Sequence, residues 1–406
     1  MSDAIAALIA HPRIAHARAA IEASDAETLA VQSAVSAIPS PTGAEGRRAA
    51  WLADRFRDAG LEGVRLDDAG NVHGWLGRRS AGPAVVLAAH LDTVFGSDVD
   101  VSVRRDGNGS RLEGPGISDN ARGLAALVTL ARALSRSAVP LSRPVLFAGT
   151  VGEEGSGDLR GVRHLFGSRD FAPHAMIAVD GAGVERIIHR GVGSVRMRAR
   201  FRGPGGHSWA AFGVANAASA VGRSAAAVAD IPIPKDPPSS CSVVRLGGGT
   251  GLNSIPAEAW LDLDIRSEGT EALSRLEGLV TTALERARDA ENARRTPGTP
   301  LLKLDLEPLG RRPSGLTPRA HPLVQAALEA NRALGLAHEL AASSTDANLP
   351  MSLGIPAIAL GAGGSAGDTH RTSEWYENTQ GPLGIVRALL VTAAVAGVNP
   401  GAAPRG

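Results

Sequence analysis

Side chains of the kinds that bind metal ions or move protons follow several apolar runs of this 406-residue chain. They are His90, Asp92, Asp119, Glu153, Glu154, Asp180 and His370. Imidazoles and carboxylates without a thiolate are typical of sites for borderline divalent ions, Zn²⁺ first, with Mn²⁺ or Co²⁺ as alternatives. Such ions activate water in hydrolytic enzymes, so the residue types predict metal-assisted hydrolysis.

The number of candidate ligands indicates two ions. Five separate segments of the chain carry them, which is more than one tetrahedral catalytic ion that keeps a water can use. The set suits two ions that share a carboxylate and lie about 3.5–4 Å apart. Glu153 and Glu154 are adjacent, so their side chains point in different directions and one is free to act as a base. Singly, each motif has an ordinary explanation, such as a helix N-cap for Asp119.

The elements before these residues are short and continuously apolar. The runs cover residues 84–89, 145–148, 176–179 and 357–360. Consecutive apolar residues are typical of strands that are buried on both faces, and helix-like stretches such as 123–136 separate them. The alternation predicts an α/β domain with a mixed, mostly parallel sheet flanked by helices. Because ligands bind outside the carboxyl ends of such strands, we expect the candidate residues to meet at one edge of one sheet.

The pattern changes after residue 190. In SVRMRARFRG, apolar residues alternate with arginines, which predicts an antiparallel strand with one wet face. The elements that follow complete the order β-α-β-β-α-β, which is typical of a ferredoxin-like domain. We therefore predict a small domain over 191–311, inserted between the two parts, 1–190 and 312–406, of a larger catalytic domain.

Composition and charge narrow the function classes. The net charge is +1 and no long basic run exists, so we expect no nucleic-acid partner. No run of about 20 apolar residues predicts a membrane span, and the N-terminal stretch is typical of a helix rather than of a signal peptide. The single cysteine, Cys241, excludes a disulfide within the chain. A cytoplasmic protein is the expectation.

Eight segments carry a family resemblance. They are AAHLDTVF, GPGISDNARGLAAL, GTVGEEGSGD, VDG, FRGPGGHSW, LNSIPAEAWLDLDIRS, SSTDANLP and GDTHRTSEWY. Together they closely resemble the M20 family of metallopeptidases and amidohydrolases, nearest in wording to its tripeptide-aminopeptidase branch. The resemblance covers nearly the whole chain, including the inserted domain, which in that family is a lid and usually the dimerisation domain. It therefore implies a homodimer.

The resemblance implies which residues hold the two ions. His90, Asp119 and Asp180 would hold one ion, and Asp119, Glu154 and His370 would hold the other. Asp119 would thus bridge the two ions.

The resemblance also implies roles for the neighbours of these ligands. Asp92 would accept the far ring N–H of His90 and so fix its tautomer. Glu153 would be the general base that takes a proton from the metal-bridging water. In the family the peptide bond after the bridging aspartate is typically cis, which corresponds here to Asp119–Asn120.

The inserted domain supplies three further candidates. His207 matches a histidine that stabilises the oxyanion in the partner subunit's active site in family dimers. Asn253 and Arg266 match positions that bind the substrate backbone or a carboxylate. The alternative for Arg266 is a surface ion pair, because it faces the same side as Asp262 and Asp264.

Position 180 directs the choice of reaction. In the family, aspartate at this position is found in aminopeptidases and dipeptidases, whereas carboxypeptidases and acylases more often have glutamate. The leading hypothesis is therefore a two-metal exopeptidase, of aminopeptidase or dipeptidase type, that acts on short peptides. An N-acyl or N-carbamoyl amino acid hydrolase of the same fold is the alternative. A non-catalytic binding protein would have no use for the base Glu153.

Overall fold

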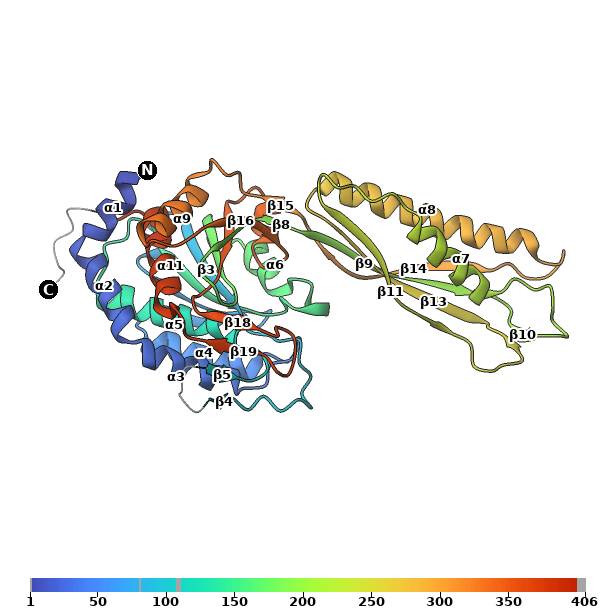
Figure 1. Cartoon of the computed structure of the whole chain (residues 1–406), viewed down its shortest axis with the longest axis horizontal. Helices are drawn as coiled ribbons and strands as arrows, with labels where there is room; N and C mark the ends of the chain where they lie inside the picture. Colours follow the sequence, from blue (N-terminus) through green and yellow to red (C-terminus); the bar gives the residue numbers. More distant parts are fainter. Residues whose placement is uncertain (1, 80–81, 107–110, 400–406) are drawn as a thin grey trace. The chain divides into compact units, whose positions relative to one another are not determined.

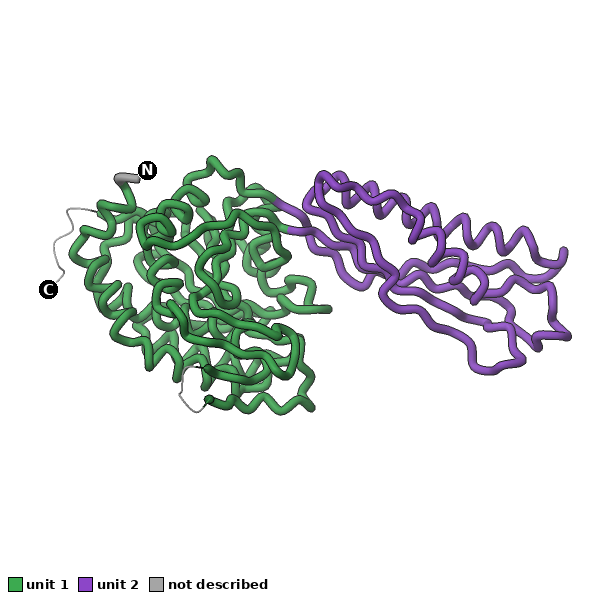
Figure 2. The backbone as a smooth tube through the Cα atoms, in the orientation of Figure 1, with its two compact units in different colours: residues 1–191, 316–406 green, residues 192–315 purple. Residues whose placement is uncertain are grey.

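The computed structural model describes residues 2–79, 82–106 and 111–399. The chain divides into two compact units (Figure 2). The first combines Met1–Gly191 with Leu316–Gly406, and the second is the continuous segment Val192–Gly315. The first unit contains every residue that the sequence analysis assigns to metal binding.

A nine-stranded sheet forms the centre of the first unit (Figure 1). Its middle strands run parallel in the spatial order β6 (Val145–Thr150), β3 (Ala84–His90), β7 (Pro173–Val179) and β17 (Ala357–Leu360). The outer strands are β1 (Glu62–Leu66), β2 (Val72–Leu76), β8 (Arg186–Gly191), β15 (Gly315–Leu316) and β16 (Glu339–Ser343). β3 lies between β6 and β7. Along the chain, β3 is followed in this sheet by β6 on one side, and β6 is followed by β7 on the other side of β3. The carboxyl ends of β3 and β7 therefore flank a topological switch point, where open α/β sheets bind ligands.

Apolar side chains cover both faces of this sheet. In β3, Val85 and Leu87 belong to a core shared with α5 and α11, whereas Val86 and Ala88 belong to a core shared with α6 and α10. The helices of the unit are α1 (Ser2–Ala10), α2 (Pro12–Ala23), α3 (Asp25–Ser36), α4 (Gly46–Asp58), α5 (Ala121–Arg136), α6 (Arg160–Gly167), α9 (Pro322–Ala333), α10 (Asn348–Ser352) and α11 (Gly381–Ala396). Burial on both faces explains why these strands are continuously apolar in sequence.

A second, smaller sheet lies in the first unit. Its strands pair in the order β18 (Ser365–Gly367), β19 (Trp375–Glu377), β5 (Arg111–Glu113) and β4 (Arg104–Arg105). Strands of two or three residues are too short to give a period-two signal, and the sequence analysis did not predict them. This sheet joins the segment before Asp119 to the segment after His370.

The second unit has a four-stranded antiparallel sheet with two helices on one face. The strands pair in the order β11 (Ser239–Gly248), β13 (Glu258–Ser267), β9 (Gly193–Arg202) and β14 (Lys303–Arg312). The helices are α7 (Ala217–Ala229) and α8 (Thr270–Arg294), and β10 (Gly206–His207) pairs with β12 (Ser254–Ile255). The apolar residues of β9 are buried under the helices, while Arg198 on the other face forms an ion pair with Asp262, at 2.7 Å between Nε and Oδ1.

The predicted fold class is confirmed. The first unit is a mixed, mostly parallel sheet between helices, and the long elements of the second follow the predicted order β-α-β-β-α-β. None of the described helices combines the length and apolarity needed to cross a bilayer.

Candidate metal centre

Three of the five candidate metal ligands lie at or after the carboxyl ends of strands of the central sheet. His90 is the last residue of β3, Asp180 follows β7, and Glu154 follows β6. Asp119 is in the loop that enters α5, and His370 lies between β18 and β19. Because β6, β3 and β7 are parallel neighbours, the topology brings their ends to one edge of the sheet.

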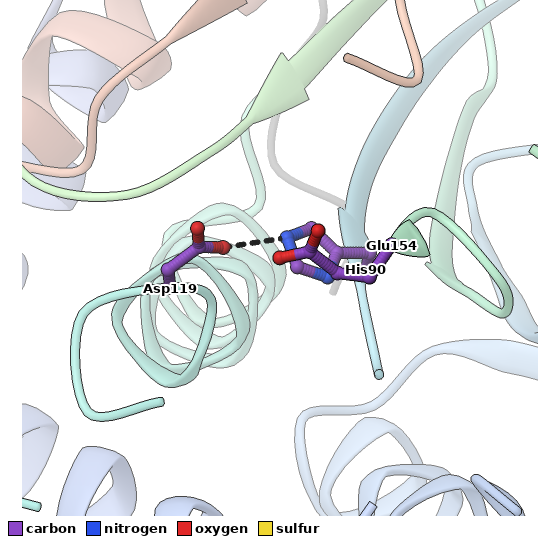
Figure 3. Close-up of side chains that lie close together, drawn as sticks. All are labelled: His90, Asp119 and Glu154. Atoms are coloured by element: carbon purple, nitrogen blue, oxygen red, sulfur yellow. Dashed lines mark hydrogen bonds and ion pairs between the residues drawn. The ribbon is translucent and has the colours of Figure 1, made fainter. Parts of the chain in front are cut away.

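Asp119 contacts both histidines of this group, and Figure 3 shows its side chain pointing toward His90. Its Oδ1 is 2.9 Å from Nε2 of His90, and its Oδ2 is 3.2 Å from Nε2 of His370. The two oxygens of one carboxylate therefore face two different histidines. Nε2 of His370 is also 2.8 Å from Oε1 of Glu154, and Nε2 of His90 is 3.6 Å from Oδ1 of Asp180.

The donor set fits a divalent metal ion. Ligand atoms of His90, Asp119 and Glu154 all lie within 4.8 Å of one another, the one such group found among the described residues. Imidazole nitrogen and carboxylate oxygen are ligands that Zn²⁺ and similar ions accept.

The imidazoles and carboxylates of this group shift one another's pKa values. Burial alone would lower the pKa of His90, but the nearby carboxylates of Asp119, Asp180 and Asp92 outweigh it and hold the pKa well above its usual value. Hydrogen bonds to Asp119 and Glu154 raise the pKa of His370 to about 10. A metal ion that bound these imidazoles would compete with protons for their nitrogen atoms.

Asp92 makes hydrogen bonds with His90 and with the two adjacent glutamates, Glu153 and Glu154. Nδ1 of His90 donates a hydrogen bond to the backbone carbonyl of Asp92 at 3.0 Å, while the nearer carboxylate oxygen is 3.6 Å away. The carbonyl contact places the proton on Nδ1 and leaves Nε2 as the ligand atom. The carboxylate instead accepts the backbone N–H groups of Glu153 at 3.0 Å and Glu154 at 2.9 Å. Asp92 therefore orients His90 through its backbone and the two glutamates through its side chain.

Asn120 ties the Asp119 loop to the end of β7. The Asp119–Asn120 peptide bond is cis, as the family resemblance implies. The buried Asn120 amide donates to the carbonyl of Val179, and its oxygen accepts the N–H groups of Gly123 and Gly181. A Cβ atom at Gly123 would lie 2.1 Å from Oδ1 of Asn120, so the close approach requires glycine.

Two buried carboxylates near the site have no role in the sequence analysis. Asp346 accepts a hydrogen bond from the Thr150 hydroxyl at 2.5 Å, and burial raises its pKa to about 6. Glu374 accepts backbone N–H groups of the Asp119 loop, and burial raises its pKa to about 7. Both lie inside segments that carry the family resemblance, SSTDANLP and GDTHRTSEWY, and that is the only sequence signal that singles them out.

The second unit holds the other candidates. His207 is exposed, and its Nδ1 accepts the backbone N–H of Trp209 at 3.2 Å. Asn253 is exposed, and its backbone carbonyl accepts the N–H of Ser208 at 2.8 Å. Arg266 forms an ion pair with Asp264, at 2.9 Å between Nη2 and Oδ2, which is the contact that the surface alternative expected. Substrate binding by Asn253 and Arg266 stays a prediction.

Several solved protein structures have a fold similar to that of this chain. The fold is similar to that of a tripeptidase from Staphylococcus aureus, with a TM-score of 0.75 and 20% identity over 91% of this chain and 98% of that one. The aminopeptidase PepT from Bacillus cereus gives a TM-score of 0.73 and 20% identity over the same shares, 91% and 98%. A hydantoinase/carbamoylase-family amidase from Burkholderia multivorans gives a TM-score of 0.60 and 16% identity over 93% and 97%.

The family model for peptidase family M20/M25/M40 matches residues 86–393. This stretch includes all five candidate ligands, together with the whole second unit. The chain therefore belongs to peptidase family M20/M25/M40 and is a hydrolase of the peptidase and amidohydrolase type.

Proposed function

We propose that this protein is a two-metal hydrolase that cleaves an amide bond in short peptides. The observation that supports two ions most directly is the orientation of Asp119. Its Oδ1 lies 2.9 Å from His90 and its Oδ2 lies 3.2 Å from His370, as expected of a carboxylate that bridges two ions. His90 and Asp180 would complete one site, and Glu154 and His370 the other. Zn²⁺ suits these ligands best, with Mn²⁺ and Co²⁺ as alternatives.

The protein's own groups would then divide the work. Bound divalent ions would supply Lewis acidity and lower the pKa of water. Glu153 would take the proton of the attacking water and pass it to the leaving amine. Its backbone N–H is fixed by Asp92, and only 5% of its surface is exposed, so the base would act from a defined and nearly dry position. Asp92 would keep His90 in the tautomer that presents Nε2.

The substrate class rests on the ligand at position 180. Aspartate here favours an aminopeptidase or dipeptidase, and a tripeptidase and an aminopeptidase are among the similar folds. A similar fold also occurs in a hydantoinase/carbamoylase-family amidase, which supports the alternative, an N-acyl or N-carbamoyl amino acid hydrolase. A cluster of carboxylates attracts a substrate ammonium group, although bound metal ions offset part of that charge.

Cleavage should require a free amino terminus on the substrate. We expect a short peptide with a free amino group to be hydrolysed faster than the same peptide acetylated, because acetylation removes the charge that the carboxylates would attract. The measurement compares kcat/KM for a tripeptide and its N-acetyl derivative in the presence of Zn²⁺, Mn²⁺ or Co²⁺. N-carbamoyl amino acids serve as a third substrate class. Faster hydrolysis of the acetylated or carbamoylated substrate would favour the alternative.

The second unit is the proposed dimerisation domain. β11 is an edge strand of its sheet, and its residues Val244 and Leu246 are 54% and 63% exposed. An exposed apolar edge strand is suited to pairing with another strand, and a second copy of the chain is the partner that the family implies. Nδ1 of His207 accepts a hydrogen bond, so the ring proton resides on Nε2, where it could be donated to an oxyanion.

His207 should act in the active site of the partner subunit. Chains with His207→Ala and chains with Glu153→Gln should each be nearly inactive as pure dimers. After subunit exchange at equal amounts, about a quarter of the sites would combine an intact Glu153 with an intact His207 from the partner. Activity should therefore return to about a quarter of the wild-type value. Verified exchange without recovery would contradict a role in trans.

A further inference from the structure

Glu374 connects the two loops that carry ligands of the proposed second ion. Its carboxylate is fully buried and accepts three backbone N–H groups of the loop that ends at Asp119. Oε1 accepts from Ser118 and Asp119, both at 2.8 Å, and Oε2 accepts from Gly116 at 3.1 Å. The N–H of Asp119 belongs to the same residue whose side chain faces both histidines.

The backbone of Glu374 fixes the other loop. Its N–H donates to the carbonyl of Arg371 at 3.0 Å, which closes the turn directly after His370. Its carbonyl accepts the N–H of Gly114 at 2.9 Å, next to the pairing of β19 with β5. One residue therefore holds the His370 turn with its main chain and the Asp119 loop with both main chain and side chain.

We propose that Glu374 is a positioning residue that sets the separation of Asp119 and His370, and so determines the affinity of the site for its second ion. The inference rests on the proposed two-metal function. Three N–H groups converge on one carboxylate, and charge-assisted hydrogen bonds of this kind are short and directional. Outer groups that orient metal ligands typically change metal affinity or activity 10–100-fold when they are replaced.

The test is Glu374→Gln, which keeps the size of the side chain but replaces one acceptor oxygen with a donor NH₂ group. In either orientation of the amide, the NH₂ group faces at least one of the three N–H groups and cannot accept it, so the Asp119 loop should shift. In titrations of the metal-free protein with Zn²⁺, we expect the weaker of two binding steps to lose about 10–100-fold in affinity. In steady-state kinetics, kcat should fall because the second ion is lost, while KM should change less.

Two further variants make the result specific. Glu377→Gln removes a carboxylate three residues further along the chain, at the end of β19, and should match the wild type in both binding steps. Glu374→Asp keeps the charge and both acceptors but withdraws them by one methylene, so it should fold and show an intermediate loss of affinity. It also serves as the test if Glu374→Gln does not fold. Thermal unfolding of each metal-free variant measures any purely structural effect.

The outcomes separate the hypotheses. Wild-type Zn²⁺ affinity and kcat in folded Glu374→Gln or Glu374→Asp would overturn the inference. A lower melting temperature of the metal-free variants with unchanged affinity would show a structural role alone and overturn it as well. If the wild-type protein itself bound one ion or none, the two-metal function would fail first, independently of any variant.

Discussion

Removal of divalent metal should abolish turnover, and its return should restore it. Ligand atoms of His90, Asp119 and Glu154 lie within 4.8 Å of one another and could hold such an ion. Lewis acidity supplies several kcal/mol to such reactions, which corresponds to a loss of about a thousandfold or more without the ion. The measurement is hydrolysis of a short peptide after dialysis against a chelator, and again after addition of Zn²⁺, Mn²⁺ or Co²⁺.

The fold should survive this treatment. The sheet is held by apolar cores on both faces, which do not depend on the metal. Circular dichroism should therefore be unchanged, and metal analysis of the reactivated protein should approach two ions per chain. Full activity in protein shown to be metal-free would contradict the mechanism.

The strands that position the site are predictable because burial on both faces leaves a clear mark. In β3 every position is buried, so the sequence is apolar throughout and ends at the polar residue His90. The outer strands are harder to recognise. β1, for example, is mostly exposed and lies at the edge of the sheet, so neither continuous apolarity nor strict alternation marks it.

The residues that support the site, Glu374 and Asp346, could not be predicted for a different reason. Glu374 acts on backbone N–H groups about 255 positions away in sequence, and Asp346 accepts a hydrogen bond from Thr150, 196 positions away. Backbone groups are present at every residue, so the sequence contains no sign of which ones a distant carboxylate will contact. Candidate metal ligands are easier to predict from the sequence than these supporting residues. Only a few residue types bind metal ions, and the strand ends indicate where such residues can meet.

Glu153→Gln should remove catalysis and spare the metal. The change keeps the size of the side chain but deletes the proposed base, and general-base catalysis is typically worth about 10²–10⁴ in rate. The backbone N–H of Glu153 would still donate to Asp92, so the loop should keep its conformation. We expect kcat to fall by about 10²–10⁴ with wild-type metal content. The measurements are steady-state kinetics and metal analysis of the same preparation.

The neighbouring residue provides the matched comparison. Glu154 differs from Glu153 in its partners, because its Oε1 lies 2.8 Å from Nε2 of His370. Glu154→Gln should therefore weaken metal binding, and excess Zn²⁺ should recover part of its activity. Excess metal should not rescue Glu153→Gln, since its defect lies in proton transfer. If metal rescued Glu153→Gln and not Glu154→Gln, the base and the ligand would be the reverse of this assignment.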